Sequence, residues 1–363
     1  MKNIFILINL LIAVSCSTAS QEHNVQPQHP KNVIFMIGDG MGIAQIQAAM
    51  TVNGNQLNFE RLAVNGFSKT SSASSYITDS AAGATAFSIG EKTYNGAIGV
   101  DKDTVAQKTV LEYAEEAGFA TGLVATSAIT HATPASFIAH QPSRRMAEEI
   151  ASDFLKTDID VFIGGGKNHF TNRKDGNDLT EILKSNGYQI VFDQAELTNV
   201  NSGKLAALLA PDGMPPFSKG RGEMLAPSAM KAIELLNQSE KGFFLMIEGS
   251  QIDWGGHKND IEYVVSELLD FNKTIGQVLD FAEKDGNTLV VITADHETGG
   301  LTLPGSSDIL NDSTAVHFST THHTSVMVPV YALGPGSEVF SGTFENNSIF
   351  IKLMNALGLK AEN

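Results

Sequence analysis

Cysteine and basic residues are both scarce in this chain. The first scarcity bears on disulfide bonds and the second on the class of binding partner. The 363 residues include a single cysteine, Cys16, so an internal disulfide is excluded. Lysine and arginine together number 24 against 40 aspartates and glutamates, which gives a net charge of -16, and no basic patch with interleaved aromatic residues occurs. This balance argues against nucleic acid as a binding partner. Internal repeats and linkers rich in proline, glycine or serine are absent as well, so we expect one large domain.

A short apolar run, Ile4 to Val14, lies near the N-terminus. It is too short to span a bilayer comfortably and predicts a secretory signal peptide over residues 1–15. The residues before Cys16 are close to a bacterial lipobox, which predicts cleavage before Cys16 and attachment of a lipid to it; ordinary cleavage after Ala19 is the alternative. Residues 16–30 would then form a flexible tether. We therefore expect an exported protein, periplasmic or held at the outer membrane by its lipid, and otherwise secreted.

The run of small residues from Thr78 to Ala86 reads as the start of a helix, and it presents the hydroxyl of Ser80. A serine there can act as a nucleophile. Its hydroxyl is too weak an acid to ionise at neutral pH unless a base, a helix N-terminus or a metal ion activates it. Ser80 therefore needs activating groups from elsewhere in the chain.

Residues of the kinds that bind metals adjoin four apolar runs. Open α/β sheets form their sites where the strands end, so segments far apart in sequence can converge on one edge. Alone, an aspartate after a strand usually caps a helix and a histidine is usually structural, but four such clusters together favour a site for zinc and magnesium. The clusters contain Asp39; Glu248, Asp253 and His257; Asp295, His296 and Glu297; and His322 with His323.

Apolar runs alternate with helical spacing along the chain, which predicts an α/β fold: a three-layer α/β/α sandwich around a large, mostly parallel sheet. Because the ligand clusters spread from Asp39 to His323, we expect residues 31–363 to form a single domain. The less regular segment 167–238 carries none of the clusters, and we expect a surface insertion there that shapes the entrance or a dimer contact. Buried strands are expected at 32–37, 120–126, 161–164, 242–248, 288–293 and 326–332, and helices at 107–117 and 261–279.

Six motifs follow one another along the chain: Gly38-Asp39-Gly40-Met41-Gly42, Thr78-Asp79-Ser80-Ala81-Ala82, His131-Ala132-Thr133-Pro134-Ala135, Glu248-Gly249-Ser250-Gln251-Ile252-Asp253 with His257, Thr293-Ala294-Asp295-His296-Glu297, and His323-Thr324. In this order and spacing they resemble the motifs of alkaline phosphatases. The resemblance runs from about Lys31 to the C-terminus. It implies hydrolysis of phosphate monoesters at alkaline pH through a phosphoserine, with two zinc ions and a third metal ion, usually magnesium.

The resemblance also implies roles for individual residues. Ser80 matches the catalytic nucleophile, and Arg144 matches the catalytic arginine that binds the substrate phosphate. A planar guanidinium suits that role because it makes two parallel charge-assisted bonds to a phosphate. The implied metal ligands are Asp253, His257 and His323 for the first zinc, Asp39, Asp295 and His296 for the second, and Asp39, Thr133 and Glu248 for the third ion.

Two neighbours compete with these assignments. Arg145 rivals Arg144 as the phosphate ligand, although the Ser-Arg pairing of the family favours Arg144. His322 rivals His323, and the family's ligand immediately before a threonine favours His323. Glu297 is either a second partner behind a metal-bound histidine or a surface carboxylate.

Two positions depart from the best-known bacterial members. His131 stands where many of them carry aspartate, which leaves the identity of the third ion open and makes His131 a residue behind the metal ligands. Trp254 stands where some carry a lysine on the phosphate side. We expect Trp254 to contribute to substrate binding, either by weakening product binding or as a stacking wall.

The partners expected are small phosphate monoesters, the membrane only through the lipid anchor, and a second copy of the chain in a homodimer. A phosphodiesterase of the same superfamily is the first alternative, although such relatives usually have a threonine nucleophile and no third metal. A catalytically inactive metal-binding lipoprotein is the second. Ser80, Arg144 and the pair of Thr133 with Glu248 favour the phosphomonoesterase, and the modified residue that sulfatases require in a different motif is absent.

Overall fold

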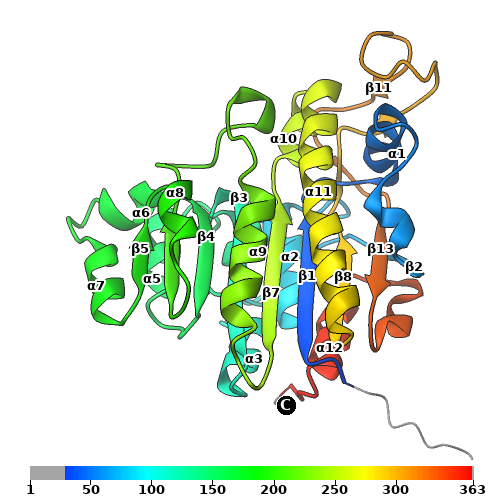
Figure 1. Cartoon of the computed structure of the whole chain (residues 1–363). Helices are drawn as coiled ribbons and strands as arrows, with labels where there is room; N and C mark the ends of the chain where they lie inside the picture. The colour runs from blue at the N-terminus through cyan, green and yellow to red at the C-terminus, as the bar shows by residue number, and fades with distance from the viewer. Residues whose placement is uncertain (1–28, 362–363) are drawn as a thin grey trace, which may run out of the picture.

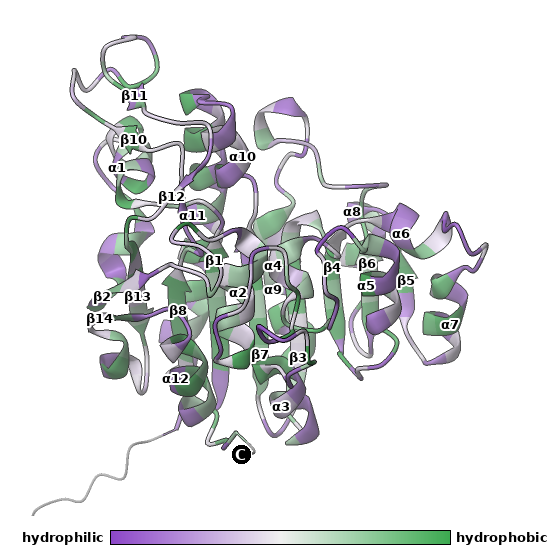
Figure 2. Cartoon of the chain, turned by 180° about the vertical axis from the view of Figure 1, so that it is seen from behind, coloured by the Kyte–Doolittle hydropathy of each residue, from purple (hydrophilic) through white to green (hydrophobic). Residues whose placement is uncertain are grey.

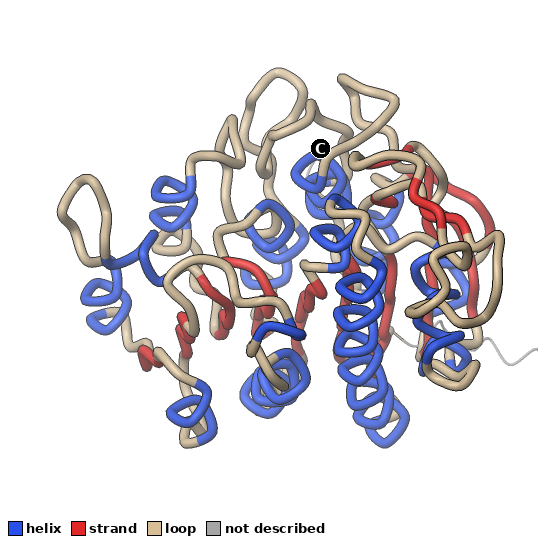
Figure 3. The backbone as a smooth tube through the Cα atoms, turned by 90° about the horizontal axis from the view of Figure 1, so that it is seen from above, coloured by secondary structure: helices blue, strands red, loops and turns tan. Residues whose placement is uncertain are grey.

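A ten-stranded sheet runs through the molecule with helices packed on both of its faces (Figures 1 and 3). The computed structural model describes residues 29–361. The predicted signal peptide, Cys16 and residues 16–28 of the predicted tether lie outside the described residues. Within 29–361, no helix has the length and apolar character needed to cross a membrane.

The strand order is β14-β2-β13-β8-β1-β7-β3-β4-β6-β5, and only β13 runs antiparallel to its neighbours. Its strands are β1 (Asn32–Gly38), β2 (Val64–Lys69), β3 (Ala120–Ala128), β4 (Val161–Gly165), β5 (Gln189–Val191), β6 (Leu205–Leu208), β7 (Phe243–Gly249), β8 (Thr288–Thr293), β13 (Val328–Leu333) and β14 (Gly342–Glu345). Two small ribbons pair β9 (Glu297–Thr298) with β12 (His323–Thr324) and β10 (Leu301–Thr302) with β11 (His317–Phe318).

The central strands are apolar because both of their faces are buried. Along β1, Ile34 and Met36 enter the core on one face while Phe35 enters the core on the other. Figure 2 shows hydrophobic residues gathered along these strands. One face is covered by α1 (Ile43–Val52), α9 (Leu225–Leu236) and α11 (Ile261–Asp285), the other by α2 (Ser80–Ile89), α3 (Val110–Glu116), α5 (Ala147–Asp153) and α12 (Ser348–Ala356). The remaining α-helices of the described residues are α4 (Ala132–Ala135), α6 (Lys167–Thr171), α7 (Leu179–Ser185), α8 (Gln194–Thr198) and α10 (Ile252–His257), and three short 3-10 helices lie at Asn58–Arg61, Phe217–Lys219 and Ser337–Phe340.

The predicted α/β/α sandwich is confirmed, and all six expected strands are present within one or two residues of their predicted ends. The helix expected at 107–117 begins three residues later, at Val110, because Thr109 caps it by accepting a hydrogen bond from Glu112 N. The segment 167–238 differs from the expected surface insertion. Its strands β5 and β6 extend the main sheet, and α9 packs into the core.

The parallel strands β1, β7 and β8 are neighbours, so their carboxyl ends meet at one edge of the sheet, the upper edge in Figure 1. Asp39 follows β1, Glu248 lies at the end of β7, and Asp295 lies two residues beyond β8. The described chain enters at the opposite edge, near the C-terminus. The fold therefore gathers the predicted ligands at the edge far from both ends of the described chain.

Candidate active site

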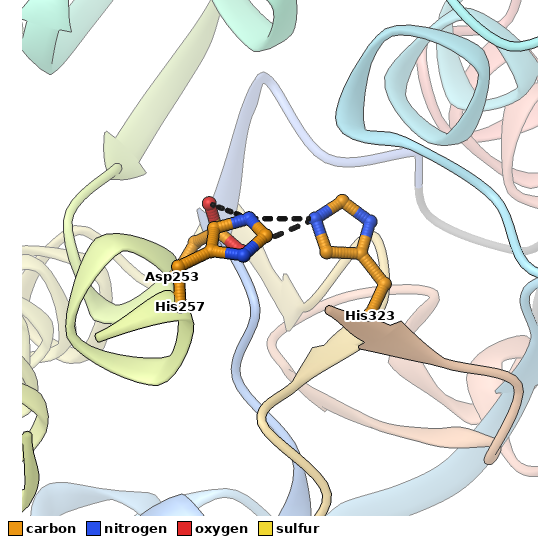
Figure 4. A group of neighbouring side chains, drawn as sticks. All are labelled: Asp253, His257 and His323. Carbon is orange, nitrogen blue, oxygen red and sulfur yellow. Dashed lines mark hydrogen bonds and ion pairs between the residues drawn. The ribbon is translucent and has the colours of Figure 1, made fainter. Parts of the chain in front are cut away.

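Asp253, His257 and His323 form the first ligand group, and Figure 4 shows their side chains converging. Asp253 and His257 lie one turn apart on α10, while His323 comes from β12. The Nε2 atoms of the two histidines are 3.1 Å apart, and they lie 3.3 Å and 3.4 Å from the two oxygens of Asp253.

Backbone carbonyls orient both imidazoles. His257 Nδ1 lies 2.7 Å from Thr321 O, and His323 Nδ1 lies 2.9 Å from Thr78 O. A carbonyl only accepts, so each Nδ1 carries a hydrogen and each Nε2 faces the carboxylate. The hydrogen bond with Asp253 raises the pKa of His257 to about 9. Burial opposes ionisation of Asp253, yet hydrogen bonds from His257 and His323 hold its pKa well below the usual range.

The second group joins Asp39, Asp295 and His296, all fully buried. His296 Nε2 lies 3.5 Å from Asp39 Oδ1 and 3.3 Å from Asp295 Oδ2. Burial, reinforced by Asp295, raises the pKa of Asp39 well above its ordinary value, and burial raises the pKa of Asp295 to about 6. Burial also lowers the pKa of His296 strongly, so its ring is neutral.

Thr298 links the first two groups, and the sequence reasoning missed it. Its hydroxyl donates to Asp253 Oδ1, and its oxygen lies 3.2 Å from His296 Nδ1. Because the single hydroxyl hydrogen goes to the carboxylate, His296 Nδ1 must donate to Thr298, which leaves a lone pair on His296 Nε2. The available clue was that Thr298 stands only two residues after His296.

The third group contains Asp39, Glu248 and His131. Burial raises the pKa of Glu248 to about 7, although Ser250 donates to it at 2.6 Å and Thr133 lies beside it. The fully buried Thr133 sits on the short helix α4, immediately after His131 and Ala132. Burial, with the charge of Arg144, lowers the pKa of His131 to about 3, so this imidazole is also neutral.

These groups fit metal ions. Among the described residues, none donates a hydrogen bond to either oxygen of Asp39, to Glu248 Oε1 or to Asp295 Oδ2, although all four atoms are buried. Buried acceptors without a donor are costly, and several carboxylates at close range repel one another. Divalent cations would bind the buried acceptor oxygens and offset the repulsion between the carboxylates. Carboxylate with imidazole is a donor set suited to zinc.

Ser80 is the first residue of α2, whose N-cap Asp79 accepts from Ala82 N at 3.0 Å. Ser80 Oγ lies 3.2 Å from His296 Nε2, beside the second group. The position combines the positive end of a helix with the ligand cluster, which are two of the activating features the serine requires.

Arg144 reaches the same place from the loop after α4. Its guanidinium donates to Asp79 Oδ2 at 3.0 Å and lies 3.3 Å from His131 Nε2. Arg145 is exposed, so the side chain at the site is that of Arg144. A cavity of about 360 Å³ is lined by Ile77, Thr78, Asp79, Ser80, Asn95, Arg144, Asp253, His257, His322 and His323.

Three side chains that the sequence singled out belong to none of the three ligand groups. Trp254 packs edge-on against the His131 ring, with centroids 6.0 Å apart, and is not among the residues lining this cavity. His322 lines the cavity but belongs to none of the three ligand groups. Glu297 is 5% exposed and bonds to residues other than histidines, so neither expectation for it holds.

Comparison with known proteins agrees with this geometry. The family model described as alkaline phosphatase matches residues 30–315. Alkaline phosphatase 3 of Bacillus subtilis is 36% identical over 94% of this chain and 92% of its own length. The structure of the alkaline phosphatase from the Antarctic bacterium TAB5 is 45% identical, with a TM-score of 0.87 over 92% of this chain and 100% of that one. A histidine-to-aspartate variant of that enzyme, with magnesium bound, is 46% identical, with a TM-score of 0.86 and the same coverage. The chain therefore belongs to the alkaline phosphatase family of enzymes.

Proposed function

We propose that this enzyme hydrolyses phosphate monoesters at alkaline pH through a phosphoserine on Ser80. The observation that carries the proposal is that a nucleophile, a phosphate-binding guanidinium and metal ligands line one cavity. The Ser80 hydroxyl at a helix N-terminus, the Arg144 guanidinium and the ligands of the first group all line it. A phosphate bound there would contact both the Ser80 hydroxyl and the Arg144 guanidinium, which can donate two parallel hydrogen bonds to it.

Ser80 and Arg144 divide the work. Ser80 Oγ attacks phosphorus, so that an Oγ–P bond forms while the ester P–O bond breaks and the alcohol leaves. Water then cleaves the Oγ–P bond, releasing inorganic phosphate and restoring the hydroxyl. Asp79 and His131 hold the guanidinium of Arg144 in place for the phosphate oxygens in both half-reactions.

The donor sets match two zinc ions and one magnesium ion. The first and second groups each supply imidazole together with carboxylate, as zinc prefers. The third group brings His131 to the carboxylates of Asp39 and Glu248. The buried hydroxyl of Thr133 lies beside Glu248, so two carboxylates and a hydroxyl offer oxygen ligands suited to magnesium. When bound, these cations lower the pKa of the attacking hydroxyl and offset the charge on the leaving oxygen. The magnesium found in the variant of the TAB5 enzyme supports a magnesium-binding third site in this family.

The location and assembly of the enzyme are also proposed. We propose that the chain is exported and anchored through a lipid on Cys16. The described chain begins at the end of the sheet opposite the ligands, which supports an anchor on the side away from the cavity. A homodimer remains a prediction, for which the exposed apolar side chains of Ile43, Val326 and Met327 offer a surface.

Turnover of p-nitrophenyl phosphate and of bis(p-nitrophenyl) phosphate at high pH, with and without zinc plus magnesium, tests the proposal. We expect metal-dependent preference for the monoester. Ser80→Ala should lower this activity by several orders of magnitude, while Ser88→Ala, a buried serine on the same helix, should retain it. Preference for the diester would indicate the phosphodiesterase alternative, and metal binding without turnover the inactive lipoprotein.

A further inference from the structure

Glu297 is a buried carboxylate beside the metal ligands with no assigned role. It follows the ligand His296 directly and is 5% exposed. Its two oxygens accept four hydrogen bonds from three separate segments of the chain. A carboxylate that ties three segments together at a ligand cluster can fix their relative positions.

The first segment is α1. Gln45, fully buried, donates from Nε2 to Glu297 Oε1 at 2.6 Å and to Thr298 O at 2.8 Å. The second is the turn after β9, where Leu301 N donates to Oε1 at 3.1 Å and Gly300 N to Oε2 at 3.2 Å. The third is β12, where the Thr324 hydroxyl donates to Oε2.

The contact with Thr324 bears directly on the metal site. In the ribbon of β9 and β12, Thr324 pairs with Glu297, and the preceding residue, His323, pairs with Thr298. This ladder is only two residues long, so backbone pairing alone holds β12 weakly. The hydrogen bond from the Thr324 hydroxyl to the Glu297 carboxylate is charge-assisted, and it holds β12 next to His323 of the first ligand group.

Room for this carboxylate comes from Gly42. A Cβ at Gly42 would lie 2.5 Å from Glu297 Cγ and 2.7 Å from Gln45 Oε1. Both distances are shorter than any normal contact, so the absence of a side chain at Gly42 is what admits Glu297. Gly42, the last glycine of the first motif, therefore provides the space that Glu297 of the fifth motif occupies.

We propose that Glu297 is a positioning residue that fastens β12 to α1 and β9, and so sets the position of His323 for the first zinc ion. The proposal rests on the proposed metal-dependent function for the role of His323. Glu297 touches neither the cavity that holds the substrate nor the nucleophile, so its effect passes through β12.

The chemistry of the site predicts which substitutions break the fastening. Glu297→Gln keeps the shape of the side chain but replaces one acceptor oxygen by an NH₂ group, which would face donors in place of accepting from them. Thr324→Val removes the donor hydroxyl at nearly constant volume, and Thr324→Ser keeps it. The serine variant is therefore the matched control for the valine variant.

Zinc retention is the measurement, because it does not depend on turnover. Zinc-loaded proteins are challenged with a chelator, and release is followed with a zinc indicator. His257→Ala identifies the phase of release that belongs to the first site. We expect Glu297→Gln and Thr324→Val to weaken first-site zinc by about 10- to 100-fold, as for other residues that orient metal ligands, with second-site zinc within about threefold of wild type. Thr324→Ser should behave as wild type.

The outcomes that overturn the proposal are specific. Unchanged first-site retention in Thr324→Val would refute it, as would equal acceleration from both sites or loss of zinc in the serine variant. If Glu297→Gln fails to fold, the valine and serine pair still decides. Monoester turnover by the same preparations separates this proposal from the proposed function: wild type that retains zinc but hydrolyses no monoester refutes the function and leaves the positioning role supported.

Discussion

Removing the metal ions should leave two buried carboxyl groups whose contribution to stability falls as the pH rises, contrary to the usual behaviour of carboxylates paired to bases. Without cations, burial raises the pKa of Glu248 to about 7 and of Asp295 to about 6, from ordinary values of 4.5 and 3.8. In the folded metal-free protein these groups hold their protons above the pH at which the unfolded chain releases them. The favourable contribution is therefore complete below pH 4 and is lost as the pH rises through 6 and 7.

The size of the effect follows from the two shifts. One pKa unit corresponds to about 1.4 kcal/mol, so each carboxyl contributes about 3 kcal/mol. Because the Asp295 charge is one of the causes that raise the pKa of Glu248, the two contributions overlap and the pair contributes less than their sum. Bound cations neutralise the same carboxylates, so the metal-loaded protein should not lose this free energy with rising pH.

Urea unfolding of chelator-treated protein between pH 5 and 8, with and without added zinc and magnesium, measures the effect. Glu248→Gln removes one of the two titrating groups and serves as the control. We expect the metal-free wild type to lose about 3 kcal/mol relative to this variant across the range. A difference between the two proteins that stays constant from pH 5 to 8, or that moves in favour of wild type, would refute the reasoning.

Two further predictions concern the surroundings of the phosphate, and a third concerns His140, which lies outside that cavity. Arg144→Lys keeps the charge but loses the planar fork, so KM for the monoester and the inhibition constant of inorganic phosphate should both rise about 10-fold or more in steady-state assays; an unchanged phosphate inhibition constant would contradict this. His131→Asp adds a carboxylate to Asp39 and Glu248 and should tighten magnesium binding, as calorimetric titration would show, whereas weaker binding would count against the third site. His140 bonds to Glu112 Oε1 at 3.0 Å and to Gly99 O at 2.7 Å, and against the opposing effect of burial its pKa is raised by Glu112. Its stabilisation of about 1–3 kcal/mol should be present below pH 6.5 and disappear as the pH rises through the raised pKa, so His140→Gln should show a flatter pH dependence of unfolding; identical profiles would exclude this role.

Most of the strands that could be predicted have both faces buried, whereas β6 is also fully buried but is only four residues long and was missed. In β1, β7 and β8 every residue is buried, so each is a continuous apolar run. The strands that were missed lie toward the edges of the sheet. The strand β2 alternates in burial, but its buried residues are Gly66 and Ser68 while Phe67 faces outward, and β14 is largely exposed, so neither produces an apolar run. Their place in the sheet depends on partners far along the chain, which local pattern does not contain.

The residues that could bind metals were likewise easier to predict than those that hold them. Asp, Glu and His at strand ends identify themselves by side-chain chemistry. Thr298 and Gln45 have no such chemistry, and their roles arise only when β9, α1 and α10 meet. Glu297 was expected to back a histidine or to lie on the surface, but its partners come from segments more than 20 residues distant and from the turn that follows it.

The glycines of the first motif allow the predicted metal ligands and the residues that support them to pack closely together. Gly40 has a φ of +72°, and a Cβ there would lie 2.7 Å from Asp253 Cα and 2.8 Å from Thr298 Oγ1. Gly42 makes the corresponding space for Glu297. The turn after β1 thus brings Asp39 to the second and third groups, and Gly40 and Gly42 allow α10 and β9 to approach within contact distance. Because each approach is limited by backbone or by a buried side chain, a side chain at Gly40 or Gly42 would push α10 or β9 away from the turn that carries Asp39, and would change the geometry available to Ser80.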